Sequence, residues 1–486
     1  MRKILPAAAV LAALGMAGCM VGPKYTQAPP VPMTPAYKEM PPDTFKETKD
    51  WKQAGGTSNV PPGKWWEIFG DPKLNSLEEQ VAAANQDLKG AEARYREARA
   101  IVSLTRAGRF PTISTGPGIS SVRNSAHQAY AAPNPGPTGE MVLPFDLSYE
   151  LDLWGRVRRS VTAAREEAQA SAADLATATL SLQAEVAFDY FELRAADAQK
   201  KLLDDTVKAY SDAVELTKNR FEGGAAPKSD LAQARTQLDA TLVQDTDVSV
   251  QRAAFEHAIA VLIGQPPAAF NIAPEPLDLE PPAIPVGVPS QLLERRPDIA
   301  AAERRVAEAN ERMGIAQAAF YPTVTLGAAV GLAGSSLLNW FTWPSRFWAV
   351  GPSMAQTLFD AGRRRAASEA SIADYDATVA LYRQATLTAF QQVEDNLSAL
   401  RILDDESRQQ RQAVEDAHEA LRIFTNRYKG GVDNYLQVIT AQTAALQNER
   451  NQVDILRRRM GSSVLLVKAL GGGWDTSSLP RMTELR

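Results

Sequence analysis

The stretch Asn-Arg-Phe-Glu-Gly-Gly at residues 219–224 returns as Asn-Arg-Tyr-Lys-Gly-Gly at residues 426–431, 207 positions later. Three further pairs keep the same order along the chain: Gly155-Arg156 with Gly362-Arg363 at an offset of 207, and Asp87–Glu92 with Asp298–Glu303 and Phe110–Ser114 with Tyr321–Thr325 at an offset of 211. Four matches in one order and at nearly one offset indicate an internal repeat. The chain is therefore predicted to contain two copies of one structural unit.

Long stretches rich in Ala, Leu, Gln and Glu lie on both sides of each glycine pair, at about 156–221 and 229–263 in the first copy and about 363–428 and 434–470 in the second. Few helix-breaking residues interrupt them, and glycine is favoured where a helix ends because it adopts positive φ. Each copy is therefore predicted to form a long helical hairpin, in which a helix of about 60 residues reaches about 90 Å. Helices of this length usually pack as coiled coils.

A shorter helix and a pair of strands precede each long hairpin. The helices are predicted at about 72–107 and 297–320, and each is followed by a proline, Pro111 or Pro322, that stops it. Apolar residues then alternate with polar or small ones over 145–153 and 324–332. A period of two with unlike faces predicts a sheet between two different environments.

Four strands per chain cannot close a barrel, and an open sheet edge is not tolerated in lipid because every backbone polar group there must be paired. Membrane barrels made of one chain start at eight strands. If these strands enter a bilayer, several chains must share one barrel. Three chains would give about twelve strands and enclose a channel, whereas the eight strands of two chains would leave little room inside.

The N-terminus reads as a secretion signal with an attached cysteine. A basic start, an apolar stretch at 4–16 and the small residues Ala17 and Gly18 precede Cys19, the one cysteine of the chain. This arrangement resembles a bacterial lipobox, which implies that Cys19 is acylated and becomes the N-terminus after cleavage. An ordinary signal peptide with an incidental cysteine is the alternative. Met20 follows in place of the aspartate that favours inner-membrane retention in such lipoproteins, so an outer-membrane destination is expected.

These patterns divide the chain into a signal peptide (1–18), a lipidated proline-rich strap (19–70), a first repeat (71–265), a proline-rich linker (266–294), a second repeat (295–470) and a tail (471–486). Strand hairpins are expected at about 111–154 and 322–359, and the turns of the long helical hairpins at 222–228 and 429–434. Aromatic residues gather at 340–348, which suits either a membrane interface or a small hydrophobic core.

Composition argues against several classes of function. A net charge of −5 argues against a basic surface that binds nucleic acid. One cysteine excludes a disulfide framework and a cysteine-cluster metal site, and three scattered histidines indicate neither a zinc site nor a catalytic centre. No nucleophile, glycine-rich phosphate loop or metal-ligand spacing accompanies the charged runs, so neither enzyme activity nor a cofactor other than the lipid on Cys19 is expected.

The residues at 19–25, 65–72, 151–156, 288–299 and 359–363 resemble the TolC-like outer-membrane efflux channels, in particular their lipoprotein (NodT-type) branch. The resemblance implies a mixed α/β membrane protein that forms a homotrimer. Its twelve-stranded barrel would lie in the outer membrane and continue into a long periplasmic α-helical barrel. It further implies docking to a periplasmic adaptor and an inner-membrane pump of the RND type, so that small molecules leave the cell passively through the duct.

The resemblance also assigns roles at the ends of the long helices. The glycines at the turns, Gly223, Gly224, Gly430 and Gly431, would contact the adaptor. Gate positions would be Ser229, Asp230, Tyr428, Gln437 and Thr440. Many relatives carry acidic residues where Gln437 and Thr440 stand here, so a constriction ringed by carboxylates is not expected. A gate held closed by hydrogen bonds is the alternative. An ordinary solvated or coiled-coil face is the alternative for each residue.

Two other functions fit parts of the pattern. A duct of the type I secretion kind would have the same architecture but would export proteins or peptides. A non-conducting lipoprotein could use long coiled coils to bridge the envelope layers. The alternating strands argue against the second alternative, because a spacer needs no sheet with one apolar face.

Overall fold

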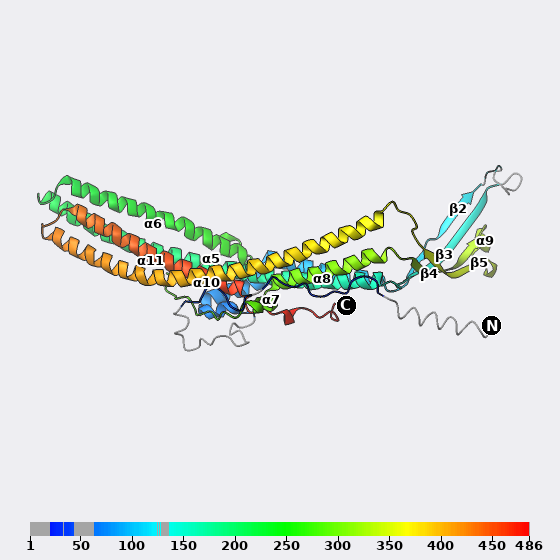
Figure 1. The fold of residues 1–486 in the computed structure, drawn as a ribbon. Coiled ribbons are helices and arrows are strands. Elements are labelled where there is room, and N and C mark those ends of the chain that lie inside the picture. The colour runs from blue at the N-terminus through cyan, green and yellow to red at the C-terminus, as the bar shows by residue number, and fades with distance from the viewer. Residues whose placement is uncertain are drawn as a thin grey trace.

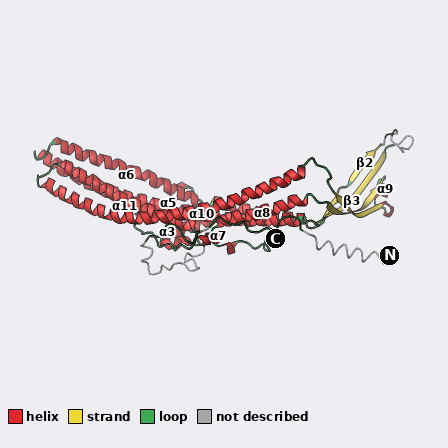
Figure 2. Cartoon of the chain, in the orientation of Figure 1, coloured by secondary structure: helices red, strands yellow, loops and turns green. Residues whose placement is uncertain are grey.

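The computed structural model describes residues 20–32, 34–42, 63–123, 125, 127 and 136–485. The signal peptide and Cys19 lie outside these residues. The molecule is elongated, with the turns of the long helical hairpins at one end and a small sheet at the other (Figure 1). Helices make up most of its length (Figure 2).

The two long hairpins repeat each other residue for residue in length. The first consists of α5 (Arg156–Glu222) and α6 (Lys228–Leu262), with 67 and 35 residues. The second consists of α10 (Arg363–Lys429) and α11 (Tyr435–Ala469), again with 67 and 35 residues. A helix of this greater length spans about 100 Å. The predicted duplication is thus confirmed. Among the described residues, no helix is apolar over a stretch long enough to cross a lipid bilayer.

Shorter helices lie beside the long ones near the middle of the molecule and from there toward the sheet (Figures 1 and 2). They are α3 (Pro72–Ala84), α4 (Gln86–Ala107), α7 (Leu292–Arg295) and α8 (Pro297–Ala318). The prediction of one continuous helix at 72–107 is wrong, because Asn85 interrupts the helix and separates α3 from α4. The Asn85 side chain accepts a hydrogen bond from the Leu88 backbone N–H (2.9 Å) and donates one to the Leu262 carbonyl (2.7 Å). Asn85 therefore caps α4 and ties it to the end of α6.

The main hydrophobic core lies near the middle of the molecule, where α6 and α11 end beside α5 and α10 (Figure 1). Short 3₁₀ helices occur at Trp65–Phe69, Pro267–Ala269, Pro289–Gln291, Trp343–Ser345 and Thr476–Ser478. The first of them buries Trp65 and Phe69 in this core. The core thus joins the two hairpins where α6 and α11 end, while α5 and α10 continue past it toward the sheet.

The sheet is antiparallel and contains β1 (Thr112–Thr115), β2 (Gly118–Val122), β3 (Thr138–Leu151), β4 (Thr323–Gly334) and β5 (Arg346–Ala355). Its order is β1-β3-β4-β5, and β2 also pairs with β3. Thr115 lies opposite Phe145 and Gly118 opposite Val142, so β1 and β2 continue in one register. Pro117 interrupts them because it has no N–H to donate. The sheet therefore has the four strands expected, the first of them interrupted.

The two faces of the sheet differ in polarity. Phe145, Val330 and Trp348 lie side by side on one face. On the other face Asp146 lies beside Ala329, which lies beside Ala349. We call the first the apolar face. Within the described chain, β1, β2 and β5 pair on one side only, so the sheet has two open edges for neighbouring chains.

Candidate functional site at the helical tips

Glycine permits the turn of each long hairpin. Gly224 and Gly431 adopt positive φ angles of 69° and 73°. The backbone N–H of the next residue closes the turn onto the last helical carbonyls, from Ala225 to Arg220 (2.7 Å) and from Val432 to Arg427 (2.9 Å). This hydrogen-bond pattern ends a helix and requires a left-handed residue that is usually glycine. Both tips therefore turn through the same hydrogen-bond pattern, with a glycine in the left-handed conformation.

The two tips differ in how they hold the arginine that precedes the turn. Arg427 pairs with Asp433, with Nε to Oδ2 at 2.6 Å and Nη2 to Oδ1 at 3.1 Å. The hydrogen bond from Arg427 holds the pKa of the Asp433 carboxyl below its usual value. In the first copy, Ala226 stands where the second has Asp433. Arg220 therefore lacks a counterpart of the Asp433 carboxylate that holds Arg427.

Arg220 instead reaches across to the second hairpin. Its Nη1 donates a hydrogen bond to the Lys429 carbonyl oxygen at 3.1 Å, and its guanidinium carbon lies 4.8 Å from the centre of the Tyr428 ring. A cation over an aromatic face contributes about 0.5–2 kcal/mol, depending on how far water is excluded. We call this contact of Arg220 with Tyr428 and Lys429 the Arg220 latch. It joins the ends of α5 and α10.

A cluster of tyrosines lies behind the latch. Tyr428 and Tyr435 are buried, and their rings are 5.2 Å apart. Ala234 of α6 and Val438 of α11 pack against them. Burial raises the pKa of the Tyr435 hydroxyl to about 12, so it stays neutral at physiological pH. Apolar packing therefore joins the two hairpins just behind the contact that Arg220 makes.

The structure places the five gate candidates in two different environments. Tyr428 and Asp230 are buried, and Tyr428 belongs to the latch. Ser229, Gln437 and Thr440 are exposed on the single chain. The Thr440 hydroxyl donates to the Leu436 carbonyl of its own helix (3.0 Å). The exposed three are thus free to face water or a neighbouring chain.

Sequence reasoning missed Arg220 and Tyr435 at this site. The only trace of the latch in the sequence is the difference between Ala226 and Asp433 at equivalent places of the two copies. That difference shows that Arg220 lacks the partner that Arg427 has, but it does not show which residues Arg220 contacts instead.

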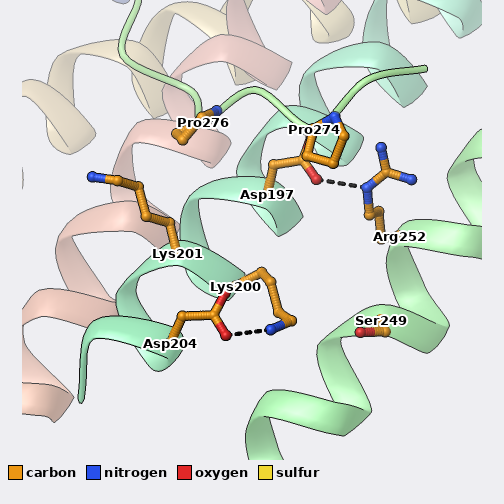
Figure 3. Close-up of a pocket in the computed structure, with 8 residues that line it drawn as sticks. All are labelled: Asp197, Lys200, Lys201, Asp204, Ser249, Arg252, Pro274 and Pro276. Atoms are coloured by element: carbon orange, nitrogen blue, oxygen red, sulfur yellow. Dashed lines mark hydrogen bonds and ion pairs between the residues drawn. The ribbon is translucent and has the colours of Figure 1, made fainter. Parts of the chain in front are cut away.

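The chain also has a cleft of about 460 Å³ at the other end of the first hairpin, between α5, α6 and the linker (Figure 3). Two of the three cationic groups that line it already have partners. Arg252 lies 2.6 Å from Asp197, and Lys200 lies 2.5 Å from Asp204 (Figure 3). Within the part of the chain that the structure describes, no group of His, Cys, Asp and Glu could hold a metal ion. The tips remain the stronger candidate site.

Long paired helices with turns at one end, joined to a sheet with one apolar face and two open edges, define a subunit of an envelope-spanning channel. The chain belongs to the outer membrane efflux protein family, whose family model matches residues 77–265 and 288–472.

The toluene efflux pump outer membrane protein TtgF of Pseudomonas putida is 32% identical over 477 residues, which cover 97% of each chain. The pyoverdine export outer membrane protein OpmQ of Pseudomonas aeruginosa is 31% identical over 418 residues, 85% of this chain and 88% of the relative. The solved structure of the outer-membrane channel OprN is 30% identical, has a TM-score of 0.85, and is matched over 94% of this chain and 100% of its own.

These matches confirm the fold class, a mixed α/β subunit of a trimeric TolC-like channel. The protein is an outer-membrane exit duct of the tripartite efflux class with a periplasmic part, and it is not an enzyme.

Proposed function

We propose that the helical tips form a gated periplasmic entrance, which stays closed until a periplasmic adaptor and an RND-type inner-membrane pump dock on them. The Arg220 latch is the observation that carries this proposal. It joins the two hairpins of one chain at the tip, where an iris would have to separate them. Small molecules would then pass without any energy input from this chain.

The strength of the latch fits a gate that a docking partner can open. One hydrogen bond contributes about 0.5–1.5 kcal/mol and one cation–aromatic contact a similar amount. Loss of about 1.4 kcal/mol changes an equilibrium tenfold. A partner that competes for Arg220 or for the Lys429 carbonyl would thus shift the population of open tips without unfolding the hairpins.

Single-channel recording of Arg220→Ala tests this proposal. We expect the open probability of the reconstituted protein to rise roughly tenfold, because about 1–2 kcal/mol of closed-state contact is lost. Arg427→Ala is the matched control, since Arg427 occupies the same place in the second copy but pairs with Asp433 in its own turn. Equal open probabilities for the native protein and Arg220→Ala would refute a gating role for the latch.

The accessible glycines favour the tips as the docking surface. Gly223, Gly224, Gly430 and Gly431 are all exposed. A docking partner could therefore approach the backbone at both turns without displacing a side chain. The gate would then lie immediately behind the surface that the adaptor contacts.

We further propose that Cys19 carries the lipid that holds the chain at the inner leaflet of the outer membrane. Cys19 lies outside the described residues, but its neighbours lie at the corner between β3 and α5. The Val21 N–H donates to the Trp154 carbonyl at 3.1 Å. Arg159 holds the following residues, donating to the carbonyls of Val21 (2.8 Å) and Pro23 (3.0 Å). An acyl group on Cys19, two residues before Val21, would enter the membrane beside the sheet.

The relatives do not select a cargo. Proteins named for toluene efflux and for pyoverdine export are 32% and 31% identical to this chain. These cargoes differ in size and polarity, whereas the two identities are almost equal. We therefore propose small-molecule efflux as the class of function, with selectivity residing in the pump.

A further inference from the structure

The connection between β4 and β5, residues 335–345, folds over the apolar face of the sheet. Gly334 lies opposite Met141 and two residues after Leu332, which places it on this face. A Cβ atom on Gly334 would lie 3.3 Å from the Trp340 Cα. Gly139, two residues before Met141, shows the same direction, since its Cβ would lie 3.5 Å from the Ser335 carbonyl oxygen. The connection therefore leans outward over the apolar side.

Two contacts hold the connection there. Trp340, the last residue of α9 (Leu337–Trp340), is buried and donates its Nε1–H to the Leu332 carbonyl at 3.3 Å. Trp343 stacks with Arg346, whose guanidinium carbon lies 3.5 Å from the ring centre. Arg346 lies opposite Leu332 and thus on the apolar face. The Arg346 side chain therefore anchors the connection on the apolar face.

The side chains that α9 and its neighbours present outward are large and apolar. Leu338 is 90% exposed, and Leu337, Phe341 and Trp343 are also exposed on the described chain. A contiguous exposed apolar patch of this kind marks a contact with a partner or a membrane. Here the patch continues the apolar face, on which Val330, Val350 and Met354 are exposed as well.

We propose that the 335–345 connection lies in the outer leaflet of the membrane, with the α9 side chains among acyl chains and Arg346, at the start of β5, at the level of the lipid phosphates. Continuity with the apolar face identifies lipid as the occupant, because the outward face of a membrane barrel is the apolar one and turns to the hydrocarbon region. Tryptophan is enriched at membrane interfaces, where its apolar ring and polar N–H meet different environments. Arginine places its stem along apolar surface and its charge near the headgroups.

The test uses an environment-sensitive nitrobenzoxadiazole label on Leu338→Cys. The labelled full-length trimer is reconstituted in phosphatidylcholine–phosphatidylglycerol vesicles whose acyl chains carry bromine, which quenches a fluorophore on contact. Val350→Cys on the apolar face gives the reference for lipid contact, and Val432→Cys at the helical tip gives the reference for water. The native chain reports any label on Cys19, its one cysteine.

We expect the label at residue 338 to emit at short wavelength and to be quenched several-fold more than the label at residue 432. Phe341→Cys should behave in the same way, which gives a second reading if Leu338→Cys assembles poorly. A label at residue 338 that behaves like the one at residue 432 would overturn the proposal. So would a label that is shielded from water but not quenched, because a second copy of the chain would then cover α9.

Discussion

Arg220 and Arg427 show how one neighbouring residue decides what a repeated side chain does. The two arginines occupy equivalent places, and both precede a glycine turn. Asp433 holds Arg427 within its own turn, while Ala226 leaves Arg220 available to the other hairpin. Divergence at one position thus converts a local ion pair into a link between two helical hairpins.

Glu78 on α3 should make stability depend on pH. Its side chain is fully buried, both carboxylate oxygens lack a hydrogen-bond partner among the described residues, and burial raises the pKa of the carboxyl to about 9. The folded state therefore favours the neutral acid. Its contribution to stability is fully present below about pH 4.5, falls as the pH rises, and levels off above about pH 9.

Glu78→Gln should remove this dependence, because an amide of the same shape stays neutral at every pH. We expect the variant to be more stable than the native protein by roughly 3 kcal/mol at pH 7, and the difference to vanish near pH 4. Thermal melting of the detergent-solubilised protein at several pH values measures it. Glu79→Gln, on the adjacent exposed residue, is the control, and a pH-independent difference for Glu78→Gln would contradict the assignment.

Arg159 should be essential for holding the N-terminal strap. Its side chain is 1% exposed and pairs with Glu311 at 2.9 Å besides holding two strap carbonyls. Arg159→Ala leaves a buried carboxylate without its partner, which costs about 3–5 kcal/mol. We expect faster trypsin cleavage after Lys24 and a lower melting temperature. Arg156→Ala, which breaks a more exposed pair with Glu150, should change neither, and unchanged cleavage in Arg159→Ala would show that the strap is held elsewhere.

At the scale of elements, the tips depend on backbone conformation. Gly224 and Gly431 have positive φ, whereas Gly430 has a φ of −77° that any residue adopts. A left-handed conformation costs a residue with a side chain about 1–2 kcal/mol, and more if it is β-branched. We expect Gly224→Val and Gly431→Val to impair dye efflux in cells that contain the pump while the protein stays in the outer membrane. Gly430→Ala should retain efflux, and normal efflux in both valine variants would show that the tips are not the entrance.

The large elements could be predicted from the sequence, because long alanine-rich stretches and glycine pairs specify helices and turns directly. The breaks within elements could not. Asn85 interrupts a helical pattern through a hydrogen bond to Leu262, which is remote in sequence. Of the site, Tyr428 was proposed from resemblance. Arg220 was missed because its partners lie 208 and 209 residues away, beyond any local pattern.

At the scale of the molecule, barrel closure rather than the lipid should hold the chains together. β1, β2 and β5 leave hydrogen-bonding groups at two edges, which neighbouring chains satisfy within the membrane. Cys19→Ser should therefore abolish acylation, read by mass spectrometry, and leave the trimer intact, read by the mass of the detergent complex. A monomer in that variant would show that the anchor is needed for assembly.

Planar-bilayer recording from the purified trimer tests the central claim, that this chain builds a conducting duct closed at its tips, most directly. We expect discrete conductance steps whose size is the same in the native protein and in Arg220→Ala, with openings more frequent in the variant. A complete absence of conductance in correctly assembled trimers, even when the tips are loosened at Arg220, Asp230 or Gln437, would contradict it.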